Sequence, residues 1–461
     1  MSLPVPFALP LLALLLAAYL LRLAARKPPL PLPPGPKGIP FIGAIHAIPP
    51  PTKPAYLHWL QHKSQYGPLS SLTVLRQPMI IVNSAALATR LLRDRAAVYS
   101  GRPPFVFAGA MIGWDKSLAM QQPDDTFKTY RRNIARVASE GKRGQVFDRV
   151  QEEEGVRFLA RLRRDPDDLF SHIAWQAGAV ILRVTYGYTP REGRDPLVDM
   201  VGQAMDEFGE VVVPGKFLVD VLPWCTRFKQ TARSMRAHLD RTVTIPYEFV
   251  KHQMANHVHN TSYLSEAIKD IGLDPQMEST SMYIAGADTT VAAIMTFFLA
   301  MMLYPDVQAR AQAELDSVIP SSRLPVSSDK PHLPYITALL KETHRWHPVA
   351  PMGLAHATTA DDQVDGYRIP KGAVVLANTW WFTHDPDVYP EPMAFKPERH
   401  LGDEPCPDPR MYTFGFGRRV CPGRHVADNA LFITIAQVLS VFKIAPPVEG
   451  EEPKVENCAE E

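Results

Sequence analysis

The sequence predicts a mainly α-helical protein with small β-sheets, of the α+β class, that opens with a membrane-spanning helix. Three observations support this class: helical patterns dominate from Asp125 onward, strand patterns are confined to short runs, and the first run is apolar and uncharged. The 461 residues are 46% hydrophobic and 21% charged, which excludes a disordered chain. A formal net charge of +1 gives no sign of a nucleic-acid-binding surface, so we expect no nucleic-acid partner.

The first segment is predicted to be an uncleaved membrane anchor over residues 1–26. Leu3 to Leu21 carries no charge and is long enough to cross a hydrocarbon core of about 30 Å. Arg22, Arg26 and Lys27 follow at once, and the positive-inside rule places that flank in the cytosol. The alternative, a cleaved signal peptide, would carry its basic residues before the apolar run. Residues 27–54 are predicted to form a proline-rich hinge, and residues 55–461 the globular domain.

Within the globular domain, the strand candidates form two predicted hairpins. One pairs residues 69–75 with residues 79–82, and the other pairs residues 366–369 with residues 373–378. The helical runs are longer, and the clearest are Gln276–Tyr304, Asp306–Val318, Pro334–His347 and Pro422–Val441. Pro305 and Pro348 end the helices before them, because proline disfavours a helical residue at the position that precedes it.

One loop with a single cysteine is the strongest candidate for a chemical site. Residues 414–424 read FGFGRRVCPGR, so three glycines and three arginines surround Cys421. Glycine lets a flat, bulky ligand approach the backbone. If Pro422 is the first residue of the next helix, the helix dipole and the arginines favour the Cys421 thiolate. A thiolate in such a loop suits an axial ligand of haem iron, whereas a structural loop cysteine is the alternative.

The full pattern F-x-x-G-x-R-x-C-x-G over residues 414–423 is far more specific than the cysteine alone. With this pattern the chain resembles the cytochrome P450 family of haem-thiolate monooxygenases, which implies the P450 fold with haem b as cofactor. The resemblance implies that Cys421 is the iron ligand and that Arg419 contacts a haem propionate. The other loop residues that it places at the cofactor are Phe414, Gly415 and Gly423. Residues 99–103 and 111–115 resemble fungal secondary-metabolism members.

A second motif interrupts a long apolar helix. Residues 285–290 read AGADTT, and polar residues there cost free energy unless they are hydrogen-bonded or functional. The family resemblance implies a distal oxygen pocket in which Gly286 leaves room for dioxygen, Thr289 donates a hydrogen bond to it and Asp288 relays protons. The alternative is structural, because threonine can bond back to a carbonyl one turn earlier.

Charged residues in two further motifs are predicted to support the cysteine loop. Glu342 and Arg345 are spaced i, i+3 on one helix face, and Arg399 lies in a later PER segment. Alone, such a pair is a common surface salt bridge that contributes little stability. The resemblance implies instead a buried structural network that holds the loop of the iron ligand.

A fourth match to the family is incomplete. The W-x-x-x-R motif, which contacts haem propionates in the family, reads Phe127 to Arg131 here, and phenylalanine lacks the indole donor of tryptophan. Arg131, and with it Lys128, can still meet a propionate, although haem is then expected to be held less firmly. His356 is a further candidate for a propionate contact.

The resemblance also implies a substrate class and partners. Pocket candidates from family position are apolar or aromatic, which suits a hydrophobic small molecule such as a terpenoid, an aromatic metabolite or a xenobiotic. They are Phe105, Phe107, Tyr283, Ile284, Val349 and Leu354. The chain carries no glycine-rich nucleotide fingerprint, so electrons must come from a separate NADPH-dependent flavin reductase. We therefore expect a single-pass protein in the bilayer of the endoplasmic reticulum, with its catalytic domain in the cytosol.

The C-terminus is expected to be short. Family members continue from the cysteine helix into a β-hairpin, whereas here Phe442–Ile444 starts a strand and the acidic, proline-containing residues 446–461 follow. Two alternatives to the monooxygenase therefore stay open. One is a haem-thiolate isomerase or dehydratase that needs no external electrons, and the other is an inactive, truncated haem-binding relic.

Overall fold

The computed structural model of the chain describes residues 30–138, 144–212, 217–220, 228–271 and 276–446. The predicted anchor over residues 1–26 lies outside the described residues, as do Cys225, Cys458 and residues 447–461. In the described part, long helices predominate and the strands are short, which confirms the mainly helical class with small sheets.

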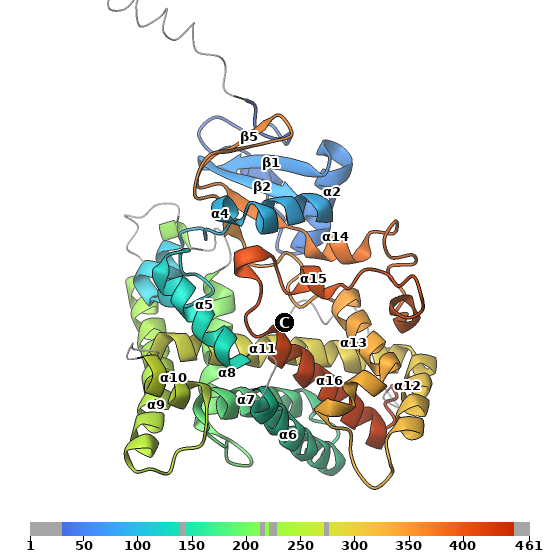
Figure 1. Cartoon of the computed structure of the whole chain (residues 1–461). Helices are drawn as coiled ribbons and strands as arrows, with labels where there is room; N and C mark the ends of the chain where they lie inside the picture. The colour runs from blue at the N-terminus through green and yellow to red at the C-terminus, as the bar shows by residue number, and fades with distance from the viewer. Residues whose placement is uncertain (1–29, 139–143, 213–216, 221–227, 272–275, 447–461) are drawn as a thin grey trace, which may run out of the picture.

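The helical body surrounds one long central helix, α11, which packs most extensively on α7 and also on α16 (Figure 1). The α-helices are α2 (Ala55–Tyr66), α3 (Ala85–Ala88), α4 (Ala96–Tyr99), α5 (Asp125–Ala138), α6 (Gly144–Arg164), α7 (Leu169–Tyr186), α8 (Pro196–Val211), α9 (Lys229–Ala255), α10 (Tyr263–Ile271), α11 (Gln276–Leu303), α12 (Pro305–Val318), α13 (Pro334–Trp346), α14 (Thr379–His384), α15 (Arg410–Thr413) and α16 (Arg424–Val441). Short 3-10 and π segments are η1 (Ile45–Ala47), η2 (Thr89–Asp94), η3 (Val106–Ile112), η4 (Trp114–Lys116), η5 (Leu218–Asp220), η6 (Ser327–His332), η7 (Pro397–His400) and η8 (Gly417–Arg419).

A four-stranded sheet stands at one end of the molecule, at the top of Figure 1. Its order is β1 (Leu69–Val74), β2 (Gln77–Val82), β6 (Val374–Ala377) and β3 (His356–Ala357). β1 and β2 form the first predicted hairpin, β2 runs parallel to β6, and β3 is antiparallel to β6. A separate two-stranded sheet pairs β4 (Asp362–Val364) with β5 (Tyr367–Ile369). The sheet thus joins the first part of the chain to its last third.

The second predicted hairpin is wrong in its pairing. Residues 367–369 form β5, which pairs with β4, and residues 374–377 form β6, which pairs with β2 and β3. Asp365 and Gly366 have φ of 50° and 82°, so a tight two-residue turn returns the chain directly onto β4. β6 is apolar on both faces and largely buried, which favours a central place in the larger sheet.

The apolar pattern of α11 reflects burial in the core. Its second half, with Phe297 and Phe298, packs among side chains of α6, α13 and α16. Among the described residues it is the one helix long and apolar enough to cross a membrane, and 61% of its most apolar window is buried inside the protein. The helix ends at Leu303 and Pro305 starts α12, each one residue earlier than the sequence predicts.

The chain after α16 does not form a strand within the described residues. Phe442 has extended dihedrals, but the backbone of Ile444 bonds to a side chain instead of a neighbouring strand. The Gln308 amide accepts from the Ile444 N–H at 2.7 Å and donates to its carbonyl at 2.8 Å. The predicted strand start at Phe442–Ile444 is therefore wrong, because α12 supplies the hydrogen bonds that a second strand would otherwise supply.

Candidate haem site

Cys421 lies in the loop that joins α15 to α16 (Figure 1). The Cys421 amide donates to the Phe414 carbonyl at 2.7 Å, which closes the loop on itself. Gly415 and Gly417 have φ of 78° and 51°, and a Cβ on Gly417 would meet the Leu92 carbonyl oxygen at 2.4 Å. Glycine is therefore required at 417 both by the backbone conformation and by the close contact with η2.

The ionisation of Cys421 differs from the expectation. α16 begins at Arg424 with Gly423 as its N-cap, not at Pro422. Burial raises the pKa of the Cys421 thiol, and the Gly423 amide and the charges of Arg131 and Arg424 do not outweigh this effect. The Gly423 amide and the charges of Arg131 and Arg424 thus favour the thiolate, as predicted, but burial opposes them and its effect is the larger one. A metal cation at the sulfur would reverse the balance, because coordination deprotonates a thiol.

Three arginines from distant parts of the chain gather beside this loop; we call Arg102, Arg131 and Arg419 the arginine cluster. Arg131 donates to the carbonyl of Val420, the residue before the cysteine, at 2.5 Å. Arg419 is 9% exposed and donates to the Ser100 carbonyl at 2.8 Å. Arg102 is 6% exposed, and its guanidinium donates only to backbone carbonyls. Within the described part of the chain, none of the three forms an ion pair with a carboxylate.

No member of the arginine cluster pairs with a carboxylate among the described residues, although the charge of Asp124 acts on Arg419 from a distance. Burial and the charge of Arg419 lower the pKa of Arg102 to about 9, and burial and the charge of Arg131 lower the pKa of Arg419 to about 10. His356 lies nearby, and burial with the charge of Arg102 lowers its pKa to about 3. Its Nδ1 bonds to the Tyr99 carbonyl at 2.8 Å. Buried cations without anions are costly, so this site fits a ligand with two carboxylates. Haem b, with two propionates and a thiolate-binding iron, has that chemistry.

Arg102 was not among the residues predicted from the sequence. It is the only charged residue between Arg95 and Asp115, and that isolation in an apolar stretch was the available signal. The preceding Gly101 lies against the Ala357 carbonyl of β3, where a Cβ would come within 2.7 Å. This close approach fixes the loop that carries Arg102.

The residues of the incomplete motif at the start of α5 lie in different environments. Phe127 is buried, and its ring centroid lies 4.0 Å from the Arg419 guanidinium, so it stabilises a cluster arginine by a cation–π contact. Lys128 instead pairs with Asp125 at 2.8 Å, with its side chain 59% exposed. The expected propionate contact of Lys128 is therefore corrected, since its own helix supplies a surface partner at i−3.

In its middle, α11 presents a small open face. Ala285, Asp288 and Thr289 are exposed, whereas the rest of the helix from residue 281 onward is buried or half-buried. The Thr289 hydroxyl donates to the Ala285 carbonyl at 2.8 Å, which is the structural alternative considered for this motif. Gly286 faces α7 and not the open face, because a Cβ there would meet the Ile181 side chain of α7 at 2.6 Å. Its missing side chain lets α7 pack closely, so the expectation that it leaves room for dioxygen is corrected.

Asp288 lies on this open face in an environment that favours its protonated form. Although the residue is exposed as a whole, partial burial of its carboxyl and the charge of Asp206 on α8 raise the pKa of Asp288. A carboxyl with a raised pKa keeps its proton to a higher pH, which a proton donor near neutral pH requires. The open face therefore carries both a hydroxyl and a carboxyl with a raised pKa.

Glu342 lies at the centre of a buried network beneath the cysteine loop. Two bonds of 2.8 Å join Glu342 to Arg345, and both side chains are fully buried. Arg399 Nε and His400 Nε2 bond to the same carboxylate at 3.1 and 3.0 Å. Burial alone would raise the pKa of Glu342, but bonds from His400 and Arg345 hold it at about 2. His400 was missed in the sequence, where only its place directly after Arg399 pointed to it.

A second ionic group joins the two ends of the cysteine loop. Arg410, at the start of α15, pairs with Asp408 at 2.6 Å and with Asp428 of α16 at 2.8 Å. Lys330 of η6 pairs with Asp428 at 2.5 Å. Sequence reasoning missed this group, because its members are scattered along the chain and follow no motif.

The six pocket candidates do not share one environment. Phe107 of η3 is fully buried and stacks on Phe217 with ring centroids 3.7 Å apart. Tyr283 is buried and donates to the Leu197 carbonyl of α8, so we correct it from a pocket residue to a core residue; Ile284 is also buried. The remaining three are half-buried or exposed, namely Phe105, Val349 and Leu354.

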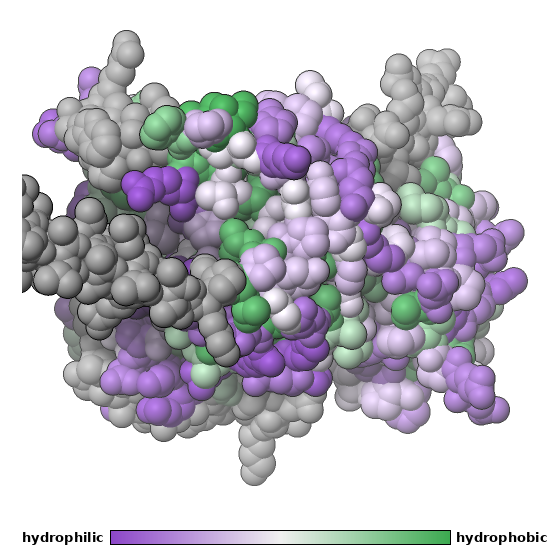
Figure 2. Space-filling model, turned by 90° about the horizontal axis from the view of Figure 1, so that it is seen from above, coloured by the Kyte–Doolittle hydropathy of each residue, from purple (hydrophilic) through white to green (hydrophobic). Residues whose placement is uncertain are grey.

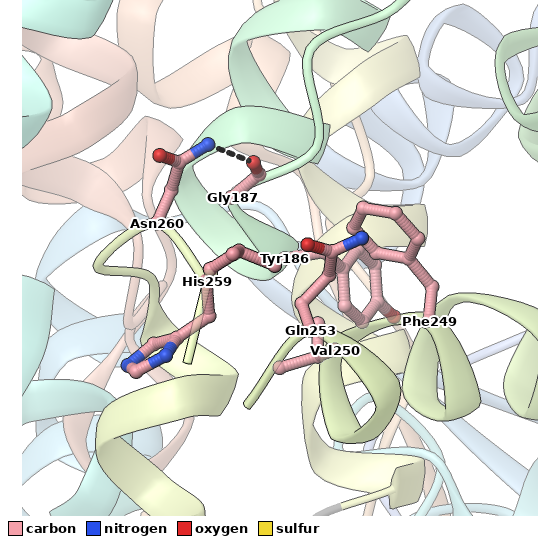
Figure 3. A pocket seen from close by; sticks show the side chains of 8 residues that line it. Tyr186, Gly187, Phe249, Val250, Gln253, His259 and Asn260 are labelled. Atoms are coloured by element: carbon pink, nitrogen blue, oxygen red, sulfur yellow. Dashed lines mark hydrogen bonds between the residues drawn. The ribbon is translucent and has the colours of Figure 1, made fainter. Parts of the chain in front are cut away.

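A separate small cavity lies between the ends of α7 and α9 (Figure 3). Asn260 lines it and donates to the Gly187 carbonyl at 2.9 Å. The cavity of about 20 Å³ has room for about one water molecule, so it is too small for a substrate.

The residues around Cys421 thus fit haem b: the sulfur could ligate the iron, and three arginines that pair with no carboxylate among the described residues could bind the propionates. Residues 33–459 match the family profile described as Cytochrome P450. The chain belongs to the cytochrome P450 family and is an oxidoreductase of the P450 monooxygenase type.

Fungal relatives cover almost the whole chain. It is 41% identical to the cytochrome P450 monooxygenase CLM2 of Gibberella zeae, over 93% of this chain and 86% of that protein. It is 41% identical to the cytochrome P450 monooxygenase claR of Ampulloclitocybe clavipes, over 96% of this chain and 84% of that protein. It is 38% identical to an O-methylsterigmatocystin oxidoreductase of Aspergillus flavus, over 91% of this chain and 83% of that protein.

Proposed function

We propose that this chain is a membrane-anchored haem-thiolate monooxygenase that inserts one oxygen atom of O2 into a hydrophobic small molecule of fungal secondary metabolism. The observation that carries the proposal is the arginine cluster beside Cys421, in which Arg102 and Arg419 are buried, Arg131 is half-buried and none pairs with a carboxylate among the described residues. For the substrate we keep the expected classes, a terpenoid or an aromatic metabolite; one relative is named for O-methylsterigmatocystin.

Different residues of the chain would bind different parts of the cofactor. Haem, when bound, would supply the activation of dioxygen and the transfer of one of its oxygen atoms. Cys421 would ligate the iron, and the arginine cluster would hold the propionates. Phe127 would keep Arg419 in place through its ring contact, and the Glu342 network would fix the loop that presents the sulfur.

Residues on the open face of α11 would donate and replace protons during the reaction. The Thr289 hydroxyl hydrogen lies on the Ala285 carbonyl, and rotation about its C–O bond would redirect it toward the open side. Asp288, whose carboxyl has a raised pKa, would take up a proton and pass it on to replace one donated from this face. The two groups would therefore act in sequence, with Thr289 as the donor and Asp288 as the reservoir.

The proposal also covers the source of electrons and the location of the protein in the cell. We infer that a separate NADPH-dependent flavin reductase supplies electrons, since the chain has no glycine-rich nucleotide fingerprint. The apolar run Leu3–Leu21 with its basic flank supports a single-pass anchor in the endoplasmic reticulum and a cytosolic catalytic domain.

The reduced, carbon-monoxide-bound absorption spectrum tests the proposal directly. We expect a strongly red-shifted Soret band in the wild type, and its loss in Cys421→Ser, because a hydroxyl is a poor ligand for the iron. Cys406→Ser is the matched control, since Cys406 is the other free cysteine of the described residues and lies outside the loop. A wild-type band at the position of a neutral ligand would contradict thiolate ligation and favour the inactive relic.

Dependence on NADPH separates the monooxygenase from an isomerase or dehydratase. The latter classes need no external electrons and no proton relay, whereas Asp288 and Thr289 both lie on the open face of α11. Turnover of a peroxide substrate without NADPH and reductase would overturn the monooxygenase assignment.

A further inference from the structure

A buried histidine lies beside the cysteine loop and takes no part in the site described above. Hydrophilic side chains are common on the surface of the protein, as the face in Figure 2 shows. His344 of α13, in contrast, is only 7% exposed, and its buried Nε2 has no hydrogen-bond partner among the described residues. A buried polar atom without a partner costs free energy, so a histidine at this position calls for an explanation.

The ring of His344 contacts the first residue of the cysteine loop. Its centroid lies 5.1 Å from the ring centroid of Phe414, and the two planes meet at 61° in an edge-to-face arrangement. Contacts of this kind between aromatic rings are favourable and fix the orientation of one ring relative to the other. The Phe414 carbonyl in turn accepts a hydrogen bond from the Cys421 amide at 2.7 Å. The histidine ring therefore packs on the residue that closes the loop around the cysteine.

His344 lies between the two ionic groups that hold the loop. On α13 it comes between Glu342 and Arg345 of the Glu342 network. Burial lowers the pKa of His344 to about 4; from the second ionic group, the charge of Asp428 opposes this shift and the charge of Arg410 adds to it. The ring is therefore neutral near pH 7, so it can pack on the loop without adding a charge to either ionic group.

We propose that His344 is a positioning residue for the iron ligand: its ring holds Phe414 in place, and the Phe414 carbonyl fixes the backbone of Cys421. This role rests on the ligation of haem by Cys421 in the proposed function. Release of Phe414 would let the loop move and admit water to the sulfur. Hydrogen bonds to a thiolate ligand weaken its donation to the iron, which raises the reduction potential.

Two substitutions at this position test the role. His344→Ala removes the ring, whereas His344→Phe keeps a ring and removes its polar atoms. His384→Ala is the matched control, because His384 is also buried, at 2% exposed, but its ring stacks on Trp380 within α14. The readouts for each haem-loaded protein are the midpoint potential of the iron and the share of the neutral-ligand band in the reduced, carbon-monoxide-bound spectrum.

We expect His344→Ala to raise the midpoint potential and to increase the share of the neutral-ligand band several-fold over the wild type. His344→Phe should restore both readouts to near the wild-type values. His384→Ala should leave both unchanged, although it also opens a cavity in the interior. If His344→Ala does not fold, His344→Leu takes its place, because leucine fills the space without a flat ring.

Wild-type readouts in His344→Ala, beside a normal thiolate band in the wild type, would overturn the positioning role alone. Equal changes in His344→Ala and His344→Phe would also overturn it, because they would trace the effect to the polar atoms and not to the ring. Equal changes in the two alanine variants would do the same, since they would point to a general loss of stability. A wild type without the thiolate band would contradict the haem ligation of the proposed function, and this role with it.

Discussion

Gly417 and Gly423 flank Cys421 and look equivalent in the motif, but they differ in backbone conformation and in the space around them. Gly417 combines a positive φ with a neighbour that a Cβ would strike, whereas a Cβ on Gly423 would meet no atom within 4 Å. Gly417 is thus needed for the fold of the loop. A side chain at Gly423 would therefore not disturb the fold of the loop.

Gly417→Ala is therefore expected to lower the free energy of unfolding by about 1–3 kcal/mol, through a strained φ and the clash with the Leu92 carbonyl. Gly423→Ala is expected to change the unfolding of the haem-free chain by less than about 0.5 kcal/mol but to reduce its haem content. Urea unfolding and the haem-to-protein ratio measure the two effects. Equal losses of stability would contradict this division.

Thr289 and Thr290 offer a similar comparison. Both hydroxyls donate to a carbonyl four residues earlier at 2.8 Å, but only Thr289 is exposed on the open face. We expect Thr289→Ala to keep haem bound while the product formed per NADPH falls several-fold, because the donor on that face is lost. Thr290→Ala should keep the wild-type ratio. If Thr289→Ala also kept it, the proposed proton role of Thr289 would be wrong.

At the scale of elements, the Glu342 network joins α13 to η7 and to the segment after α14. Arg345 also donates to the carbonyls of Thr383, Pro392 and Ala394, so one carboxylate neutralises the groups that hold these segments together. Removing its charge leaves two buried guanidiniums without a counter-ion.

Glu342→Gln is expected to lower the free energy of unfolding by about 3–5 kcal/mol and to release haem, because it breaks a buried ion pair on one side. Glu398→Gln is the matched control in the neighbouring segment, where Glu398 pairs with Arg310 on the surface. A surface pair of this kind contributes at most about 1 kcal/mol. Thermal or urea unfolding decides, and a loss in Glu342→Gln as small as in the control would refute the network's structural role.

At the scale of the whole molecule, Glu278 links three helices through a buried carboxyl. It is 2% exposed on α11, accepts from Asn133 of α5 at 3.2 Å, and bonds to the Tyr263 hydroxyl of α10. No cation of the described residues pairs with it, and burial raises its pKa to about 8. The junction of α5, α10 and α11 is therefore built around a protonated acid.

The sign of the resulting pH dependence follows directly. The Glu278 pKa is about 8 in the folded chain and close to 4.5 in the unfolded chain, so unfolding between these pH values releases a proton. Its contribution to stability is complete below pH 4.5, falls by at most about 1.4 kcal/mol per pH unit up to pH 8, and then levels off. Glu278→Gln should remove this slope.

The difference in unfolding free energy between Glu278→Gln and the wild type, measured from pH 6 to 9, checks the prediction, because other titrating groups cancel in the difference. Glu266→Gln, on α10 in a surface pair with Lys269, is the control and should give no slope. A flat difference for Glu278→Gln would show that the buried carboxyl is already ionised near pH 6.

Local patterns in the sequence predicted the helices and the cysteine loop, but they did not predict which distant segments pair with each other. The long helices follow from apolar periodicity and proline positions, and Cys421 follows from a local motif. The partners of β5 and β6, the surface pairing of Lys128 and the contact of Gly286 with α7 depend on which segments meet, which periodicity does not encode. Arg102 was missed for the same reason, because its role follows from its closeness in space to Arg131 and Arg419.

The parallel pairing of β2 with β6 has a consequence for synthesis. Asn83 and Asn378, directly after these strands, are bonded at 2.8 Å although 295 residues separate them. At roughly 5–20 residues per second, a ribosome needs about 15–60 s to make that interval. Throughout this time one edge of the nascent β1–β2 hairpin has no strand partner from β6, and a chain that stalls before residue 374 keeps that edge open to aggregation.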